Sequence, residues 1–324
     1  CHPAVGRGVQ KKQPGAFHEA AVGGPGAVNL PEWKQGGGCN GSFNRDHKNR
    51  GDRKMKAVVL VDNLTKGTLA AEWGLSIYVE YQGHKILLDT GASDRFVRNA
   101  QTLGISLGEV EFGVLSHAHY DHADGMGAFF ERNAAAPFYI REGAGENCYG
   151  KRWIFHKYIG IHRGFLKKYR DRIRYAEDGC EILPGVSLLA HHTEGLEALG
   201  AQNHLYIRQN GRYRPDSFEH EQSLILDTEK GLVILSSCSH GGADQIIQEV
   251  AAAYPGRRIY GMIGGFHLYH TSSEGVRALA GRIRSTGIEK IYTGHCTGQP
   301  AFEILKEELG DQVCQLRTGM EIVL

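Results

Sequence analysis

The ten residues SHAHYDHADG at positions 116–125 decide how this chain is interpreted. They follow the apolar run Phe112–Leu115, which predicts a short buried strand. Six consecutive positions in this stretch hold three imidazoles and one carboxylate. Histidine and aspartate side chains gathered in a turn between a strand and a helix indicate a metal site.

The spacing assigns the four side chains to two ions. We expect His117 and His119 to converge on one cation, and Asp121 and His122 to point to a second cation nearby. Nitrogen and oxygen donors of this kind suit Zn²⁺, Mn²⁺ or Fe²⁺ rather than Ca²⁺. The alternative is a chance surface cluster or a closed structural zinc site, but structural zinc sites favour cysteines at CxxC spacing, which the sequence lacks. We predict two divalent metal ions, first of all zinc, with manganese or iron as alternatives.

The HxHxDH pattern after a strand resembles the signature of the metallo-β-lactamase superfamily. Upstream, the sequence LLDTG at 87–91 resembles that superfamily's first motif, whose aspartate steadies the metal-binding loop; Asp89 takes this position. Such a partner fixes the orientation of ligand imidazoles. The resemblance implies an α/β fold of four layers, αββα, and catalytic roles for Asp121 and Asp89.

Further segments resemble a narrower branch, the 7,8-dihydropterin-6-yl-methyl-4-(β-D-ribofuranosyl)aminobenzene 5′-phosphate synthase-like proteins. Together they extend over most of residues 57–298. The segments are Asp62-Asn63, Gly74–Ser76, Asn99-Ala100, Phe218–Gln222, Cys238–His240, Gly264–Leu268 and His295–Gly298.

The outer ligands follow from strand ends and from the resemblance. His240 and His295 each come between a predicted strand and a helix, which favours metal ligation. The expected cages are His117, His119 and His240 for one metal and Asp121, His122 and His295 for the other. For His267, ligation, substrate contact and ordinary packing are equally compatible with the sequence.

The sequence departs from the superfamily pattern at two places. The usual histidine between the HxHxDH segment and the later acidic motif is not clearly present, and His191 or His192 could supply it, although we rank both below His240. After the predicted strand Leu232–Ser236, where many relatives place a bridging aspartate, this chain has Cys238. Cys238 is either a zinc-binding thiolate or a small packing residue, and the same choice holds for Cys296.

A basic aromatic segment, Lys151–Arg174, carries nine Lys/Arg against the single acid Asp171, interleaved with aromatic rings. It is either a solvated helix face or a lid that holds an anionic, ring-bearing substrate over the metals. In the second case Lys167, Lys168 and Arg170 would bind the substrate.

Composition limits the possible partners. The 324 residues are 41% hydrophobic with a formal net charge of +1, which gives no electrostatic reason to expect nucleic acid. No run of 18 apolar residues could span a membrane and no secretory signal opens the chain, so we expect a cytoplasmic protein with a small-molecule substrate and no membrane partner. The seven scattered cysteines are expected to be free thiols.

The chain divides in sequence at Met55. Residues 1–54 hold 11 of the 44 glycines and four of the nine prolines with almost no apolar periodicity, which predicts a disordered N-terminal extension. Met55 is compatible with a natural start and equally with a preceding surface tail. Residues 55–324 alternate predicted strands with helices such as Ala243–Ala253 and Glu274–Ser285, so one catalytic domain with two facing sheets and outer helices is expected.

These observations predict a metallohydrolase that acts on a phosphorylated or otherwise anionic small molecule. The resemblance alone implies an alternative, a synthase that displaces diphosphate from a pterin with an aminobenzene ribosyl phosphate. A non-catalytic metal-binding or sensory module is the third possibility, and the absence of a closed ligand set in the sequence argues against it.

Overall fold

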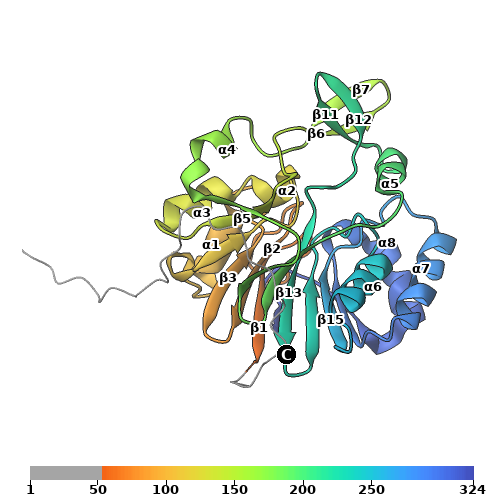
Figure 1. The fold of residues 1–324 in the computed structure, drawn as a ribbon. Coiled ribbons are helices and arrows are strands. Elements are labelled where there is room, and N and C mark those ends of the chain that lie inside the picture. The colour runs from red at the N-terminus through yellow and green to blue at the C-terminus, as the bar shows by residue number, and fades with distance from the viewer. Residues whose placement is uncertain (1–52) are drawn as a thin grey trace, which may run out of the picture. The chain divides into compact units, whose positions relative to one another are not determined.

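The structure, a computed structural model, describes residues 53–324 (Figure 1). The predicted extension 1–54 therefore lies almost wholly outside the described residues, and the division at Met55 stays a prediction. The described part begins with Arg53, which forms an ion pair with Asp227 at 2.9 Å. None of the helices between Arg53 and Leu324 is long and apolar enough to cross a lipid bilayer.

The first large sheet has seven strands in the order β18-β1-β2-β3-β4-β5-β8. Neighbours from β18 to β3 are antiparallel, and those from β3 to β8 are parallel. The strands are β1 (Met55–Val61), β2 (Ser76–Tyr81), β3 (His84–Leu88), β4 (Phe112–Val114), β5 (Phe138–Arg141), β8 (Ile173–Ala176) and β18 (Glu321–Val323).

The second large sheet also has seven strands, in the order β17-β16-β15-β14-β13-β10-β9. Its four strands from β14 to β17 run parallel, so their carboxyl ends meet at one edge. The strands are β9 (Cys180–Leu183), β10 (Val186–Ala190), β13 (Gln222–Thr228), β14 (Gly231–Leu235), β15 (Ile259–Gly264), β16 (Lys290–Thr293) and β17 (Val313–Gln315).

Helices cover the outer face of each sheet, as Figure 1 shows with α1 and α3 beside the first sheet and α6 to α8 beside the second. The longer helices are α1 (Arg95–Thr102), α3 (Met126–Arg132), α5 (Leu196–Gln202), α6 (Ala243–Ala253), α7 (Ser273–Ser285) and α8 (Gln299–Leu309).

Alternating residues explain the layers. In β1, Val59 belongs to a core that also contains Leu226 of the second sheet, whereas its neighbour Leu60 packs in a core with Phe129 of α3. In β14, Ile234 faces outward into a third core with Ile246 of α6. Because successive strand side chains point to opposite faces, strands between a sheet and a helix layer are apolar on both faces. The predicted αββα architecture is confirmed.

A third, four-stranded sheet departs from the prediction. Its order is β12-β11-β6-β7, and we call it the flap sheet. The strands are β6 (Cys148–Arg152), β7 (Phe155–Tyr158), β11 (Leu205–Gln209) and β12 (Arg212–Pro215). Most of the basic aromatic segment therefore is not a helix face: α4 (Phe165–Lys168) is its only α-helical part in the described structure.

The cysteines meet the expectation of free thiols only in part. Among the described residues, Cys148, Cys238, Cys296 and Cys314 are free. Cys180 is disulfide-bonded, so the expectation is wrong at this position.

Candidate metal centre

The centre lies where several strands end on the same edge of the two large sheets. The HxHxDH segment follows β4 and enters the short helix α2 (Tyr120–Ala123). Cys238 and His240 follow β14, His267 follows β15 and His295 follows β16. Since the carboxyl ends of parallel strands meet at one edge, segments more than 100 residues apart in sequence are brought together there.

Three of the predicted ligands form one cluster. One ligand atom each of His117, His119 and His240 can be chosen so that all lie within 4.8 Å of one another, and all three side chains are buried. The Nε2 atoms of all three have no hydrogen-bond partner in the described structure. Buried imidazole nitrogens are rarely left unpaired, so these atoms fit a site for a metal ion.

The electrostatics of this cluster also suit a metal. Burial, together with the neighbouring His122, lowers the pKa of His117 well below its ordinary value. Burial and His240 do the same to the pKa of His119. Both imidazoles are therefore neutral at pH 7, and only a neutral imidazole has the free electron pair that a metal needs.

The other three predicted ligands form a second cluster. His122 Nε2 lies 3.2 Å from His295 Nε2 and 3.8 Å from Asp121 Oδ2, and His295 Nε2 lies 3.4 Å from the same oxygen. Burial would raise the pKa of Asp121, but His122 and His295 outweigh burial and hold that pKa below its ordinary value. Burial lowers the pKa of His295, but its hydrogen bond with Asp121 outweighs burial and raises the pKa to about 9. An ionised carboxylate and two imidazoles thus converge on one point, and a metal ion bound there would replace the proton that His295 carries at pH 7.

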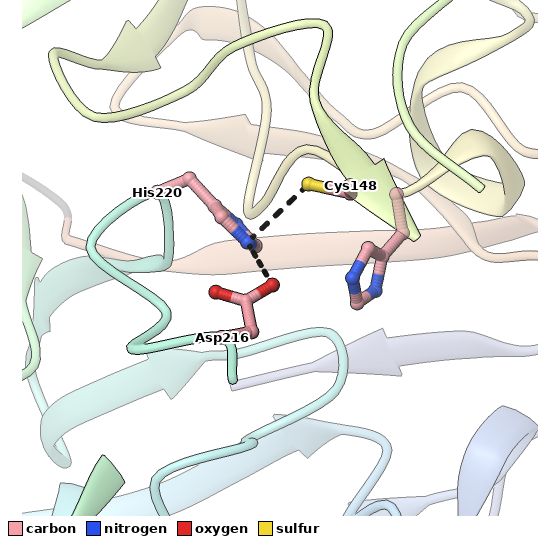
Figure 2. Close-up of side chains that lie close together, drawn as sticks. Cys148, Asp216 and His220 are labelled. Atoms are coloured by element: carbon pink, nitrogen blue, oxygen red, sulfur yellow. Dashed lines mark hydrogen bonds and ion pairs between the residues drawn. The ribbon is translucent and has the colours of Figure 1, made fainter. Parts of the chain in front are cut away.

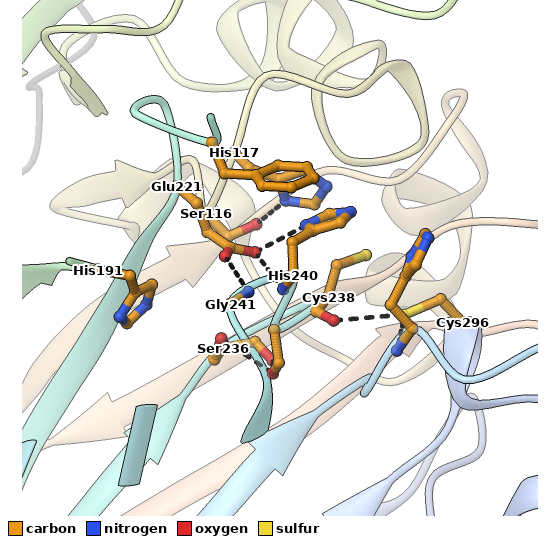
Figure 3. A network of polar contacts seen from close by, with 12 residues as sticks. Ser116, His117, His191, Glu221, Ser236, Cys238, His240, Gly241 and Cys296 are labelled. Carbon is orange, nitrogen blue, oxygen red and sulfur yellow. Dashed lines mark hydrogen bonds and ion pairs between the residues drawn. The ribbon is translucent and has the colours of Figure 1, made fainter. Parts of the chain in front are cut away.

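The Cys238 thiol lies between the two clusters. Its Sγ atom is 3.3 Å from His122 Nε2, and it can be grouped as a metal ligand with His117 and His122 or with His295 and Cys296. Figure 3 shows Cys238 between His240 and Cys296. Cys238 occupies the position at which many members of the superfamily have a bridging aspartate. Its sulfur atom is close enough to ligands of both clusters to bind a metal together with either of them.

Asp89 supports one ligand of each cluster. Its Oδ1 accepts a hydrogen bond from the Ser116 backbone N–H at 2.7 Å, and its Oδ2 lies 2.8 Å from His122 Nδ1. The Ser116 hydroxyl donates to Asp89 Oδ2 at 2.6 Å and lies 2.8 Å from His117 Nδ1. The fully buried carboxylate therefore orients both His117 and His122, which is the role that the resemblance implied for this residue.

Glu221 plays the corresponding part for His240. Its Oε1 lies 2.8 Å from His240 Nδ1 and accepts the His240 backbone N–H at 3.0 Å (Figure 3). Burial would raise the pKa of Glu221, but His240 outweighs it and holds the pKa below its ordinary value. In the sequence, Glu221 belongs to the segment Phe218–Gln222, which resembles the synthase-like branch. That resemblance was the one available signal for it in the sequence.

The loop after β1 supports His295. Asn63 Oδ1 lies 3.0 Å from His295 Nδ1, and Asp62 Oδ2 accepts the His295 backbone N–H at 3.0 Å. Burial raises the pKa of Asp62 to about 6. Asp62 and Asn63 are 232 or more positions away from His295 in sequence, so their function could not be predicted from spacing.

A second buried group of polar side chains adjoins the first cluster, and Figure 2 shows its labelled members Cys148, Asp216 and His220. His220 Nδ1 accepts the Ala118 backbone N–H at 3.2 Å, and His220 Nε2 lies 3.0 Å from Asp216 Oδ2 and 3.6 Å from Cys148 Sγ. Because Nδ1 accepts, Nε2 carries the hydrogen and donates to Asp216. His220, which sequence reasoning missed, therefore holds the backbone between His117 and His119. One ligand atom each of His119, Cys148, Asp216 and His220 can be chosen so that all lie within 4.8 Å of one another, so this group could also hold a metal ion.

His267 lies at the edge of the centre. Its ring centroid is 4.5 Å from that of His240, and neither of its ring nitrogens has a partner in the described structure. Burial lowers its pKa. A group of possible ligand atoms joins it with Cys238 and His240. Two exposed rings, Trp73 and Tyr269, lie next to this side of the centre, with Trp73 5.4 Å from His295 and Tyr269 4.8 Å from His267 between ring centroids.

The alternative histidines are not part of the centre. His191 Nδ1 lies 3.0 Å from Glu249 Oε2, and its Nε2 lies 2.9 Å from the Ser223 hydroxyl. His192 is largely exposed and pairs with Asp178 at 2.8 Å. With both ring nitrogens of His191 engaged, His240 is the histidine that completes the cluster of His117 and His119.

The three predicted substrate-binding cations are not brought to the centre by any contact within residues 53–324. Lys167, Lys168 and Arg170 are exposed on α4 and just after it. Phe165 of α4 stacks on Phe130 of α3 with ring centroids 6.1 Å apart, which attaches this helix to the outer layer. The exposure of the three cations favours a solvated face.

The fold and the two adjoining ligand clusters define a metallo-β-lactamase-type centre, and comparison with known proteins agrees. Residues 74–205 match the family model of the metallo-beta-lactamase superfamily. In this match and in its fold the chain is similar to the metallo-β-lactamase superfamily.

Two curated relatives and two solved structures narrow the comparison. The chain is 28% identical over 283 residues to the 7,8-dihydropterin-6-methyl-4-(β-D-ribofuranosyl)-aminobenzene-5′-phosphate synthase of Methanocaldococcus jannaschii, covering 80% of this chain and 96% of the relative. An uncharacterized protein of the same organism is 27% identical over 252 residues, 77% of this chain and 93% of the relative. The predicted resemblance to the superfamily and its synthase-like branch is confirmed.

Among solved structures, a metal-dependent hydrolase of the β-lactamase superfamily superposes with a TM-score of 0.71 at 29% identity, covering 83% of this chain and 98% of that chain. The metallo-β-lactamase fold protein YhfI from Bacillus subtilis superposes with a TM-score of 0.51 at 11% identity, covering 84% and 100%. At that identity the second similarity concerns the fold alone.

Proposed function

We propose that this chain is a metal-dependent hydrolase that acts on an anionic, phosphorylated small molecule. The observation that carries the proposal is the pair of adjoining clusters, His117/His119/His240 and Asp121/His122/His295, with buried ring nitrogens that lack protein partners in the first. Two such clusters side by side fit two divalent ions, with zinc as the first choice and manganese or iron as alternatives.

Two bound ions would supply a water nucleophile of lowered pKa and would neutralise charge that develops on a phosphoryl oxygen. The protein's own groups set the geometry. Asp121 has a pKa below its ordinary value, so it stays ionised and can orient an attacking water by accepting its hydrogen bond. Asp89 and Glu221 hold the ligand imidazoles in place.

The rings beside the centre support an organic, ring-bearing substrate. Trp73 is 47% exposed and Tyr269 42% exposed, and the two rings meet edge to face with centroids 5.9 Å apart. Exposed aromatic side chains next to a polar centre can stack on a planar substrate group. In this proposal Trp73 and Tyr269 contact the ring of the substrate, a role that the sequence had suggested for the segment Lys151–Arg174.

The test is hydrolysis of bis(p-nitrophenyl) phosphate by protein that has been stripped with a chelator and then reloaded with Zn²⁺ or Mn²⁺. We expect turnover only after reloading, and a lower rate in Trp73→Ala at unchanged metal content. Undiminished turnover by the stripped protein would contradict the proposal. Metal binding without turnover on any phosphoester would favour a metal-binding or sensory module instead.

A second candidate is the synthase reaction, because the similarity to the M. jannaschii enzyme extends over 96% of that enzyme. There the amine of an aminobenzene ribosyl phosphate would displace diphosphate from a pterin. The two candidates separate in one assay with the pterin diphosphate. A synthase releases diphosphate only when the aminobenzene compound is present, whereas a hydrolase releases phosphate or diphosphate without it.

A further inference from the structure

The tip of the flap sheet exposes three consecutive large apolar side chains. Register pairs Arg152 with Phe155, so Trp153 and Ile154 form the turn of the β6–β7 hairpin. Trp153 is 86% exposed, Ile154 81% and Phe155 73%. Trp153 has φ +59°. This backbone conformation favours glycine and is unfavourable for a tryptophan. A contiguous exposed apolar cluster of this kind is typical of an interaction site.

The two hairpins of the flap sheet are strongly basic. Residues 148–163 and 204–215 contain seven Lys/Arg and no Asp or Glu. All seven except the half-buried Lys151 are exposed, and no ion pair within residues 53–324 joins any of them to a carboxylate. The seven are Lys151, Arg152, Lys157, Arg163, Arg208, Arg212 and Arg214. Exposed cations around an apolar tip fit an anionic partner that also accepts apolar side chains.

A second copy of the chain does not fit this description. Three side chains at a hairpin tip expose far less than the roughly 800 Å² that each partner of a stable protein interface buries. Two flap sheets would also repel each other, because both are basic. The apolar tip therefore fits a partner that needs no shaped pocket to receive the three side chains.

Single-stranded nucleic acid would match the positive charge of the flap sheet, but most aromatic rings of the sheet are not free to stack on bases. A binding platform for bases needs aromatic faces that are free for stacking. Here His156 stacks on Tyr213 with centroids 3.8 Å apart and planes inclined by 6°, and Tyr149 packs edge to face on both Tyr158 and Tyr213 at 5.3 and 5.0 Å. These rings of the sheet thus cover one another, and the two free rings of the tip, Trp153 and Phe155, flank the aliphatic Ile154, which cannot stack on a base.

We propose that the flap sheet docks on the surface of a membrane that contains anionic lipids. Trp153, Ile154 and Phe155 would insert at the boundary between headgroups and acyl chains, where a tryptophan is favoured and no shaped pocket is needed. The surrounding Lys and Arg would contact lipid phosphates. The expectation of no membrane partner came from the absence of a spanning segment, and surface docking does not require one.

The geometry links this surface to the metal centre. The Tyr120 backbone N–H donates to the Ile159 carbonyl at 2.8 Å just after β7, and His119 bridges to Gly160. In Figure 1 the flap sheet rises from the sheet edge that carries α2. Docking would therefore bring the edge of the molecule that holds the metal centre toward the lipid surface.

The experiment is co-sedimentation of the full chain with phosphatidylcholine vesicles, with and without phosphatidylglycerol. We expect binding only with phosphatidylglycerol, weakened by added salt. Trp153→Ser/Ile154→Ser/Phe155→Ser should lower the partition coefficient at least tenfold, and so should Lys157→Gln/Arg212→Gln/Arg214→Gln. The matched control is Tyr175→Ser/Val323→Ser, which removes two other exposed apolar side chains, 55% and 63% exposed, outside the flap sheet and should bind as the parent does. Circular dichroism and metal content check the fold of each variant.

Several results would overturn the proposal. They are no sedimentation with phosphatidylglycerol vesicles, equal partition of the tip variant and the parent, or loss of binding in the control variant to the same extent. Tip-dependent binding of a single-stranded oligonucleotide without vesicle binding would assign the surface to nucleic acid. Concentration-dependent dimerisation of the parent that the tip variant loses, again without vesicle binding, would assign it to a second copy.

Discussion

The metal centre and the basic aromatic segment Lys151–Arg174 both stand out in the sequence by residue type, yet the structure treats them in opposite ways. The predicted ligands are buried, and outer partners such as Asp89 and Glu221 orient them. The cations Lys167, Lys168 and Arg170 are exposed and have no described contact with the centre.

The difference follows from what burial costs each side chain. A buried imidazole or carboxylate needs a partner for every polar atom, so a cluster of them in the interior implies a supporting network. A lysine or arginine on the surface is solvated by water and needs no partner, so a run of them says little about where it lies in the fold. Residue type in a buried motif is therefore more informative than residue type in a charged run.

The largest expected effect distinguishes a ligand histidine from a surface histidine. The purified protein should contain one to two equivalents of Zn, Mn or Fe, and His119→Ala should lose this metal and more than about a hundredfold of the activity, exceeding the usual effect of an outer partner. Elemental analysis and steady-state kinetics measure both. His192→Ala, which removes an exposed histidine, is the control and should match the parent. If His119→Ala retained its metal, His119 would not be a ligand, and the contrast between the buried ligands and the surface residues would not hold.

The outer partners should have a smaller effect. Asp89→Asn keeps the shape of the side chain but loses the charge that orients His122 and, through Ser116, His117. We expect a loss of about 10–100-fold in metal affinity, measured by competition with a chromophoric chelator. Asp94→Asn, at an exposed carboxylate, should leave affinity unchanged. Equal affinities of the Asp89 variant and the parent would show that the network is dispensable.

Glu249 pairs with His191, a buried histidine outside the metal centre, and its replacement tests whether this pair contributes to stability and not to metal binding. Burial would raise its pKa, but its hydrogen bond with His191 outweighs burial and lowers the pKa. A carboxyl group with a lowered pKa stabilises the fold above its unfolded pKa, and this contribution is lost as the pH falls through its folded pKa. Glu249→Gln should therefore lower the free energy of unfolding by about 1 kcal/mol at pH 7, a discounted value for a partly exposed carboxylate.

The two proteins should converge in stability as the pH falls below the unfolded glutamate pKa of about 4.3 and through the lower folded pKa of Glu249, which urea titrations at pH 7 and in acid would show. Metal content and activity at pH 7 should match the parent. A loss of metal in Glu249→Gln would mean that His191 acts on the centre after all.

The smallest effect is expected in the basic segment. Because Lys167, Lys168 and Arg170 are exposed, replacing all three with glutamine should change KM for a phosphorylated substrate less than about twofold, as exposed charges contribute little. Steady-state kinetics on phosphorylated and unphosphorylated forms of one compound would measure this. A tenfold rise in KM for the phosphorylated form alone would support the lid hypothesis and would show that these cations, like the metal centre, act on the substrate.

Local sequence predicted most of the layered fold, because apolar runs of strand length and amphipathic helices report directly which faces are buried. Helix Ala243–Ala253 was predicted with its observed bounds. The sequence predicts the strand His204–Arg208, which matches β11, but the rest of the flap sheet was missed. None of the residues of β7 and β12 is buried, so neither strand has a row of apolar residues that faces a core. Strands of this kind form by pairing with β6 and β11, which pattern alone does not reveal.

The sequence by itself determined that His117, His119, Asp121 and His122 would gather at one point, because four donors within six residues of a turn cannot separate far. Only the tertiary structure decided which distant groups join them. The ends of β14 and β16 bring His240 and His295, and the support of Glu221 comes from beside β13. The order of strands in a sheet depends on packing across the whole domain, so side chains far apart in sequence meet only after that order is established.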